Sequence, residues 1–166
     1  MGPVSADDSL DTDLTFDAGP VTQPGEYYAD LIVSSNDPVN KKYVVPVVMT
    51  VTAPEDWGKL EGTVTSLGYC DANPAPVEGA EVLVTTTSGM TYTLTTDAAG
   101  YYISWFPESE SPLTIKVTAP EHTEGYAEGV VITGGDTTTM DFDLRWLEPC
   151  VSTDPTTFSV DVPVGT

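Results

Sequence analysis

Apolar residues in this chain recur at every second position, in short stretches that end at turn-forming residues. In "YVVPVVMTV" one face carries Tyr43, Val45, Val47, Met49 and Val51, and "PLTIKVTAP" and "TTTMDFDLRW" alternate in the same way. A period of two places successive side chains on opposite faces of a β-strand. No stretch of ten or more residues has the apolar period of an amphipathic helix. The sequence therefore predicts an all-β protein.

The charge of the chain narrows the classes of partner. Its 166 residues include 26 acidic and 5 basic side chains, which gives a formal net charge of −21. Phosphates require a basic surface, so we exclude nucleic acid as a partner, and an anionic membrane surface is disfavoured for the same reason. No apolar run has membrane-spanning length, and the opening "MGPV" lacks the features of a signal peptide. A strongly acidic surface usually keeps a protein soluble, and the alternative interpretation is that it binds cations.

Turn-forming residues divide residues 1–53 into a few strands. One strand is expected near Leu14-Thr15-Phe16, and a turn at Pro24-Gly25 precedes the strand in "EYYADLIVSSNDP". Pro46 has no amide to donate, so its strand is expected to lie at a sheet edge or to carry a bulge. Residues 54–58 are expected to form a linker.

Residues 59–149 are predicted to form a complete sandwich. "KLEGTVTSL" begins it, "AEVLVTTT" and "MTYTLTTD" make a hairpin across Ser88-Gly89, and "DAAG" turns the chain into "YYISWF". "PLTIKVTAP", "GVVIT" and "TTTMDFDLRW" supply three more strands, the last with Met140, Phe142 and Leu144 on one face. Seven short strands separated by turns are typical of a β-sandwich of about 90 residues.

Four motifs stand together in this region: "GTV" at 62–64, "VEGAEV" at 77–82, "TDAAGYY" at 96–102 and "DFDL" at 141–144. With them the region resembles the carboxypeptidase-regulatory-like, transthyretin-like family of bacterial sandwich domains. The resemblance covers the whole second unit and implies an Ig-like or transthyretin-like β-sandwich. Similar domains accompany secreted proteases and glycosidases, so it also implies that the parent protein can be an enzyme while this piece is not.

The two ends of the chain share a different pattern. "QPGEYYADLIVSSNDP" with "VVPVVMTV" is similar to the last strands of bacterial immunoglobulin-like spacer domains, and "CVSTDPTTFSVDVPVGT" resembles the opening strand of such a domain. The implied order is the C-terminal strands of one spacer over 1–53, the complete sandwich over 59–149, and the first strand of a following spacer over 150–166.

The last stretch, "PTTFSVDVPVGT", is a strand without an obvious partner. Phe158, Val160, Val162 and Val164 share one face, and full burial of such side chains contributes about 1.5–3 kcal/mol each. Left exposed, such a strand is a sticky edge. Three arrangements stay open: it pairs with the chain's own N-terminal strands, it complements the next copy head to tail, or the chain ends are fragment boundaries without pairing.

Cys70 and Cys150 are the only cysteines, and they flank the second unit. First and last strands of a sandwich often end close together, so a structural disulfide and an oxidising compartment are expected. In the chain-entropy description, closing a loop of about 80 residues adds about 4 kcal/mol. A two-cysteine metal site is the rival, but neither cysteine has a histidine or another cysteine nearby in the sequence.

No pattern of residues points to catalysis, and no catalytic residue is assigned. His122, the sole histidine, lies in "APEHTEGY" and is expected to be a solvated loop residue, and "GxSxG" is absent. Asp7, Ser9, Asp11 and Asp13 imitate the start of a calcium loop, but the glycine at its sixth position and the glutamate at its twelfth are missing. No metal ligand is assigned, although a calcium site at another acidic turn stays open.

The sequence favours a non-catalytic structural module of a secreted or cell-surface protein. Its partners would be copies of itself or adjacent domains, joined by β-strand complementation into head-to-tail filaments. The alternative is a carbohydrate- or calcium-binding accessory module of a secreted protease or glycosidase. Trp57, Trp105 and Trp146 offer faces for sugars, although tryptophans at domain edges usually pack against linkers.

Overall fold

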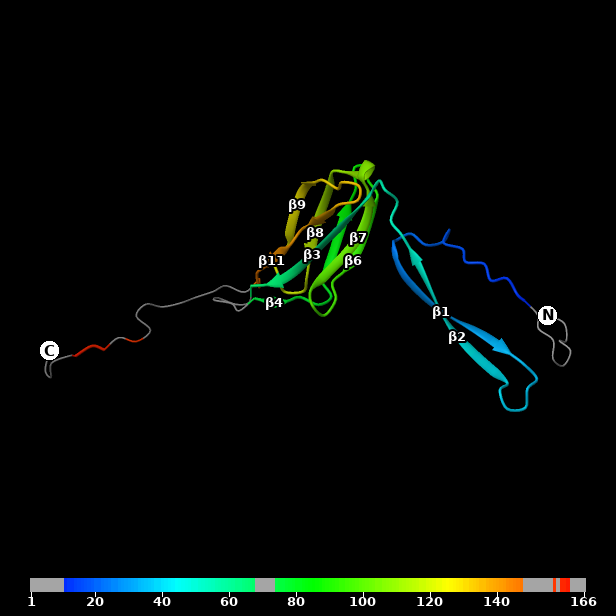
Figure 1. The fold of residues 1–166 in the computed structure, drawn as a ribbon. Coiled ribbons are helices and arrows are strands. Elements are labelled where there is room, and N and C mark those ends of the chain that lie inside the picture. The colour runs from blue at the N-terminus through cyan, green and yellow to red at the C-terminus, as the bar shows by residue number, and fades with distance from the viewer. Residues whose placement is uncertain (1–10, 68–73, 148–156, 158, 162–166) are drawn as a thin grey trace. The chain divides into compact units, whose positions relative to one another are not determined.

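The computed structural model describes residues 11–67, 74–147, 157 and 159–161. In these ranges every regular element is a β-strand except for one short 3-10 turn, η1 (Glu108–Glu110). The all-β fold that the sequence predicts is confirmed (Figure 1). The chain divides between Ala53 and Pro54 into two compact units.

The described part of the first unit contains one antiparallel hairpin, drawn in Figure 1 as a long two-stranded ribbon. It consists of β1 (Gly25–Ser34) and β2 (Lys42–Val51), which pair along their whole length without a bulge. β2 contains five valines, and β1 contains two tyrosines with Ile32 and Val33, and such β-branched and aromatic side chains suit a pleated surface. The turn between them follows from Asp37, whose carboxylate accepts hydrogen bonds from the amides of Val39 and Asn40 at 2.6 and 2.9 Å.

Two expectations for this unit have different outcomes. Pro46 lies opposite Asp30, and because the described sheet has only two strands, Pro46 lies on an edge strand as predicted. The strand expected near Leu14-Thr15-Phe16 is not formed, since residues 11–18 have no regular structure. That prediction is wrong, because a strand is stabilised by pairing and no described strand pairs with these residues.

One sheet of the second unit is built around a single central strand, β3 (Trp57–Ser66). Along one of its edges, β7 (Tyr101–Pro107) and then β4 (Ala75–Pro76) pair with it in antiparallel fashion. Along the other edge, β10 (Thr137–Thr139) and β11 (Phe142–Leu144) pair with it in parallel. The chain therefore enters the sandwich at the start of β3 and leaves β11 beside the end of β3.

The second sheet has the strand order β6 (Thr91–Thr95), β5 (Glu81–Thr85), β8 (Leu113–Thr118) and β9 (Gly125–Val130). All adjacent strands in this sheet are antiparallel. The hairpin of β5 and β6 turns at Ser88-Gly89 as predicted, where the glycine takes a φ of 85° that other residues rarely adopt.

The two sheets enclose one hydrophobic core because alternate residues of each strand point between them. Leu60 and Val64 of β3 have no exposed surface, and the ring of Phe106 meets that of Tyr92 edge to face at 5.2 Å. Both sheets contribute to the core, which consists of Leu60, Val64, Ala80, Val82, Val84, Tyr102, Phe106, Leu113, Ile115, Val117, Val130, Ile132, Phe142 and Leu144.

Two predicted boundaries in this unit are wrong. The linker expected over 54–58 is shorter, because β3 already begins at Trp57. The strand expected over "GVVIT" lies earlier in the chain: β9 ends at Val130, after Gly129 has taken a positive φ of 71°. A glycine in that conformation turns the chain out of the extended path that alternation alone suggests.

The last predicted strand is interrupted at Met140 and Asp141, between β10 and β11. There the Asp141 carboxylate accepts hydrogen bonds from the backbone amide and the hydroxyl of Thr63, both at 2.8 Å, in place of a backbone ladder bond. The Tyr102 hydroxyl donates to the Met140 carbonyl oxygen at 2.6 Å. Gly62 leaves the room that this arrangement needs, since a Cβ on it would stand 1.8 Å from that same oxygen.

Candidate functional site

The hairpin of the first unit presents an apolar face that no described segment pairs with or closes into a core. Residues directly opposite each other on paired strands share a face, so the register assigns this face without ambiguity. On it, the side chains of Leu31 and Tyr43 are 37% and 67% exposed. We call it the apolar face, and it consists of Tyr27, Ala29, Leu31, Val33, Tyr43, Val45, Val47, Met49 and Val51.

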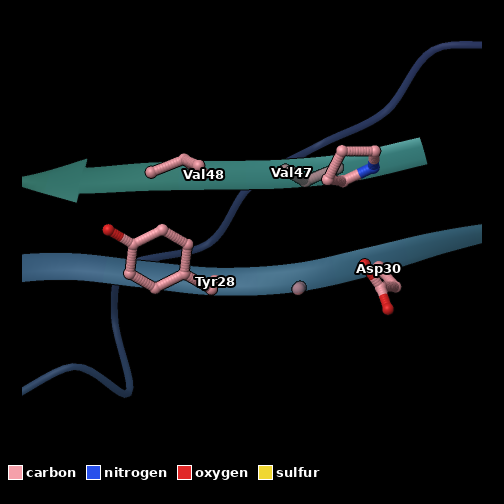
Figure 2. A pocket seen from close by; sticks show the side chains of 6 residues that line it. Tyr28, Asp30, Val47 and Val48 are labelled. Carbon is pink, nitrogen blue, oxygen red and sulfur yellow. The ribbon is translucent and has the colours of Figure 1, made fainter.

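The opposite face of the hairpin is mixed in character. Figure 2 shows the ring of Tyr28 beside Val48 of the neighbouring strand, with Asp30 further along β1. These residues line an open depression together with Ala29, Pro46 and Val47. Asp30 is the one ionisable group besides the Tyr28 hydroxyl in this lining, so the depression offers no set of convergent polar groups of the kind that fixes a small ligand.

The hydrogen-bond pattern shows which backbone groups of the hairpin point outward. The Ser35 amide donates to the Lys41 carbonyl oxygen at 3.0 Å, so this residue pair, which lies just beyond the ends of β1 and β2, is a hydrogen-bonded pair. Along an antiparallel ladder, hydrogen-bonded residue pairs alternate with pairs that are not hydrogen-bonded. Followed along the register, odd-numbered residues bond across the hairpin and even-numbered residues direct their N–H and C=O groups outward. The outward residues of β1, all with an N–H, are Glu26, Tyr28, Asp30, Ile32 and Ser34; those of β2 are Lys42, Val44, Pro46, Val48 and Thr50.

This pattern makes the two hairpin edges unequal. The edge of β1 carries an unbroken row of donors, whereas Pro46 interrupts the row on β2. The Pro46 signal was readable in the sequence, but the intact edge of β1 was not, because it depends on the register.

The residues predicted for strand complementation lie mainly outside the described part of the chain. Val160 is described and is 69% exposed, without strand structure, and Phe158, Val162 and Val164 lie outside the described residues. Cys70 and Cys150 also lie outside them. Two described residues that precede the cysteines in the sequence are in contact: the Leu67 amide donates to the Leu144 carbonyl oxygen at 2.8 Å.

His122 belongs to a polar cluster that the sequence analysis missed. Its Nε2 lies 2.9 Å from the Ser66 hydroxyl, which also accepts a hydrogen bond from the Trp146 indole at 3.1 Å, and its Nδ1 lies 2.7 Å from the Pro120 carbonyl oxygen. His122 lies in a loop as predicted, but it is not freely solvated, because it is half-buried and its ring lies against the Trp146 ring. The available signal was Ser66, a polar residue at an inward position of "GTVTS".

This cluster borders a small open depression on the sandwich. Ser66, His122 and Trp146 line it together with Ala75, Pro76, Val77 and Glu78. A serine, a histidine and a partly exposed indole are suited to hydrogen bonding and stacking with a sugar ring. In the described structure their hydrogen bonds are made to one another, which fixes the end of β3 against the segment after β11.

A second polar cluster lies on the outer face of the sheet around β3. The Tyr101 hydroxyl donates to the Glu61 carboxylate at 2.7 Å, and the Lys59 ammonium pairs with the same carboxylate at 2.8 Å. Lys59 and then Tyr101 lower the pKa of Glu61, and the hydrogen bond to Glu61 raises the pKa of Tyr101 to about 12. These contacts tie β3 to β7 outside the core.

The Tyr101 bond predicts a dependence of stability on alkaline pH. Because folding raises this pKa, the contribution of Tyr101 is complete below the unfolded pKa of about 10 and is lost as the pH rises toward about 12. Tyr101→Phe is expected to melt below the parent chain at neutral pH, by a difference that shrinks over that interval. Thermal unfolding at a series of pH values checks this. Tyr126→Phe, at a side chain that is 60% exposed, is the control, and an equal trend there would contradict the assignment.

Metal binding and membrane crossing have no support in the described residues. Within them, no three or more His, Cys, Asp or Glu side chains stand together as possible metal ligands. Of the residues that imitate a calcium loop, Asp11 and Asp13 are described, and Asp7 and Ser9 are not. No helix in the described ranges has the length and apolarity needed to cross a bilayer.

The family model of carboxypeptidase regulatory-like domains matches residues 59–145. No curated protein matches the sequence. Among solved structures, the Bacillus anthracis TIE protein is similar at 12% identity and a TM-score of 0.41, over 75% of this chain and 26% of that one. GBS52, the minor pilin of Streptococcus agalactiae, is similar at 13% and 0.40, over 81% and 66%. The plantain pollen allergen Pla l 1 is similar at 17% and 0.39, over 58% and 99%.

Proposed function

The chain belongs to the family of carboxypeptidase regulatory-like domains through residues 59–145, and from this we propose that it is a non-catalytic structural module of a modular secreted or cell-surface protein. In this proposal the sandwich is a self-contained spacer. The hairpin of the first unit is the place where further β-structure joins it.

The observation that carries the proposal is the contrast between the two units. Core residues of the sandwich such as Leu60 and Leu144 have no exposed surface, whereas Tyr43 and Val33, which lie opposite each other on the apolar face of the hairpin, are 67% and 47% exposed. An isolated two-stranded hairpin is at best marginally stable, and contiguous apolar surface usually marks a site of association. The hairpin therefore has the properties of a docking element.

The ionisable groups of the sandwich support a structural role. Glu110, whose pKa is lowered by hydrogen bonds from Ser88 and then Thr86, ties the β5–β6 turn to the η1 segment. Glu61 ties β3 to β7, and Asp141 ties the break between β10 and β11 to Thr63 of β3. Each of these carboxylates is engaged in holding strands or turns together, which explains its environment without a reaction.

A disulfide between Cys70 and Cys150 is part of the proposal. Leu67 and Leu144 are hydrogen-bonded neighbours, and the two cysteines follow them by three and six residues. Such a bridge would staple the first strand of the sandwich to the segment after its last strand. It would also place the module in an oxidising compartment, as a secreted or surface protein requires.

Self-association of the whole chain tests the structural proposal. Sedimentation velocity over a wide range of concentration is expected to show a mass that rises with concentration. Because each chain carries a net charge of −21, repulsion opposes contact, and added salt is expected to strengthen association by screening that charge.

A different result would favour an accessory binding module. A chain that stays monomeric under all these conditions, binds a polysaccharide, and loses that binding in a Trp146→Ala variant would contradict the structural proposal. Trp146 is the residue to replace because its ring is 38% exposed at the depression beside His122. A rise in melting temperature with calcium would point to the calcium-binding alternative.

A further inference from the structure

The free edge of β1 is the better acceptor for an added strand. Natural sheets close their terminal edges with proline and lysine, since proline has no N–H to donate and lysine resists burial. The outward row of β2 contains both, Pro46 and Lys42. The outward row of β1 contains the acidic residues Glu26 and Asp30 but neither a proline nor a lysine, and it keeps every donor. The structure thus marks β2 as the terminal edge and β1 as the edge that pairs.

Residues 157–164 have the pattern of a matching strand. In an extended strand, residues of the same parity share both a face and a hydrogen-bonding edge. The apolar set Phe158, Val160, Val162 and Val164 keeps all its N–H groups, whereas the opposite set contains Pro163. A strand formed by these residues therefore has a complete row of N–H donors only along the edge to which its apolar residues direct their N–H groups.

The alternation of a strand also fixes the direction of the added strand. The residues of β1 on the apolar face direct their N–H groups toward β2. A parallel strand added at the other edge of β1 has the same orientation as β1, so its residues on the apolar face direct their N–H groups toward β1. An antiparallel strand there would direct them away. Parallel pairing thus extends the apolar face and keeps every donor. The resulting sheet of the added strand, β1 and β2 would have Pro163 and Pro46 on its two outer edges.

The topology of the sandwich favours a strand from another copy. The chain enters at Trp57 and leaves β11 opposite Ser66, so entry and exit lie at opposite ends of the ten-residue strand β3, about 30 Å apart. The nine residues 148–156 can span at most about 32 Å when fully extended. Within one chain, residues 148–156 would have to be almost fully extended merely to bring residue 157 back to the entry end of β3, so pairing with a second copy is the less constrained arrangement.

From these constraints we propose that residues 157–164 of a second copy add a parallel strand to the free edge of β1 and extend its apolar face. This inference rests on the proposed structural function of the chain and identifies a second copy of the chain as the partner. Each copy has one donor strand and one acceptor edge, so the contact is heterologous and propagates head to tail.

Paired proline variants test the acceptor edge. Ile32→Pro removes an outward N–H from β1, and Val44→Pro removes the outward N–H of the residue directly opposite it on β2. Both side chains are partly exposed, at 52% and 44%, and neither change breaks a hairpin hydrogen bond. In sedimentation velocity we expect Ile32→Pro to weaken association at least about tenfold and Val44→Pro to leave it near that of the parent.

Two further variants test the donor. A chain ending at residue 154, and a full-length Val160→Asp chain, are both expected to be monomeric. Mixing Ile32→Pro with the truncated chain should give a one-to-one dimer that does not grow, because one partner keeps only its donor and the other only its acceptor. Circular dichroism of each variant confirms that its sandwich remains folded.

The outcomes separate this inference from the proposed function. If the parent chain associates but Val44→Pro weakens it as much as Ile32→Pro, the β1 edge is the wrong acceptor. If both donor variants associate normally, the partner segment is wrong, and if the mixture stays monomeric, pairing between copies is wrong. In these three cases the structural function stands. A parent chain that never associates overturns both.

Discussion

Replacing Phe106 by alanine is expected to lower the free energy of unfolding of the sandwich by about 3–5 kcal/mol. Phe106 is 1% exposed, lies on the inward face of β7, and packs edge to face against Tyr92 across the two sheets. The smaller side chain leaves a cavity that the close-packed strands around it cannot fill by small movements. Urea unfolding followed by circular dichroism should show a lower midpoint with an unchanged slope.

Ile103→Ala is the matched control for this change. Ile103 lies on the same strand but on its outer face, where it is 45% exposed, so its truncation is expected to cost less than about 1 kcal/mol. Equal losses at the two positions would mean that β7 is not oriented as described.

Replacing Gly62 by alanine is expected to cost about 3 kcal/mol, through overpacking and not through a cavity. The added Cβ would stand 1.8 Å from the Met140 carbonyl oxygen and 2.9 Å from the Tyr102 hydroxyl oxygen. Backbone atoms cannot give way as a flexible side chain can, so β3 would have to separate from the break between β10 and β11. The melting temperature should fall by on the order of 10 °C.

Gly89→Ala separates this steric effect from the general cost of losing a glycine. Gly89 has a φ of 85° and open space around its Cα, so only backbone strain of about 1 kcal/mol is expected. If Gly62→Ala proved no more harmful than Gly89→Ala, the close approach of Met140 to β3 would be refuted.

Alternation predicted the core where the two faces of a strand differ in polarity. In "TTTMDFDLRW" one face was predicted to carry Met140, Phe142 and Leu144, and the structure buries Phe142 and Leu144 while Asp141 and Asp143 are exposed. "YYISWF" is apolar on both faces, so the sequence did not assign the two tyrosines. The structure buries Tyr102, with the polar Ser104 on the same inward face, and leaves Ile103 outside, against its hydrophobicity. Register with β3 decides this orientation.

The candidate site was predictable in part. Pro46 indicated an edge strand, because its missing donor is a property of the residue itself. The choice of β1 as the intact edge required the register of the hairpin, which no local pattern gives. The role of His122 was missed because its partners, Ser66 and Trp146, are distant in sequence and meet only when β11 runs parallel to β3.

The parallel arrangement of β3 with β10 and β11 also determines how the sandwich responds to tension. A pull on the chain draws Trp57 outward at one end of β3 and Leu144 outward at the other, so the neighbouring strands are sheared along their length. Inter-strand hydrogen bonds lie across that direction, so they are loaded together and do not open one after another. A module connected in this way resists a pull on its two ends without being unzipped from either of them.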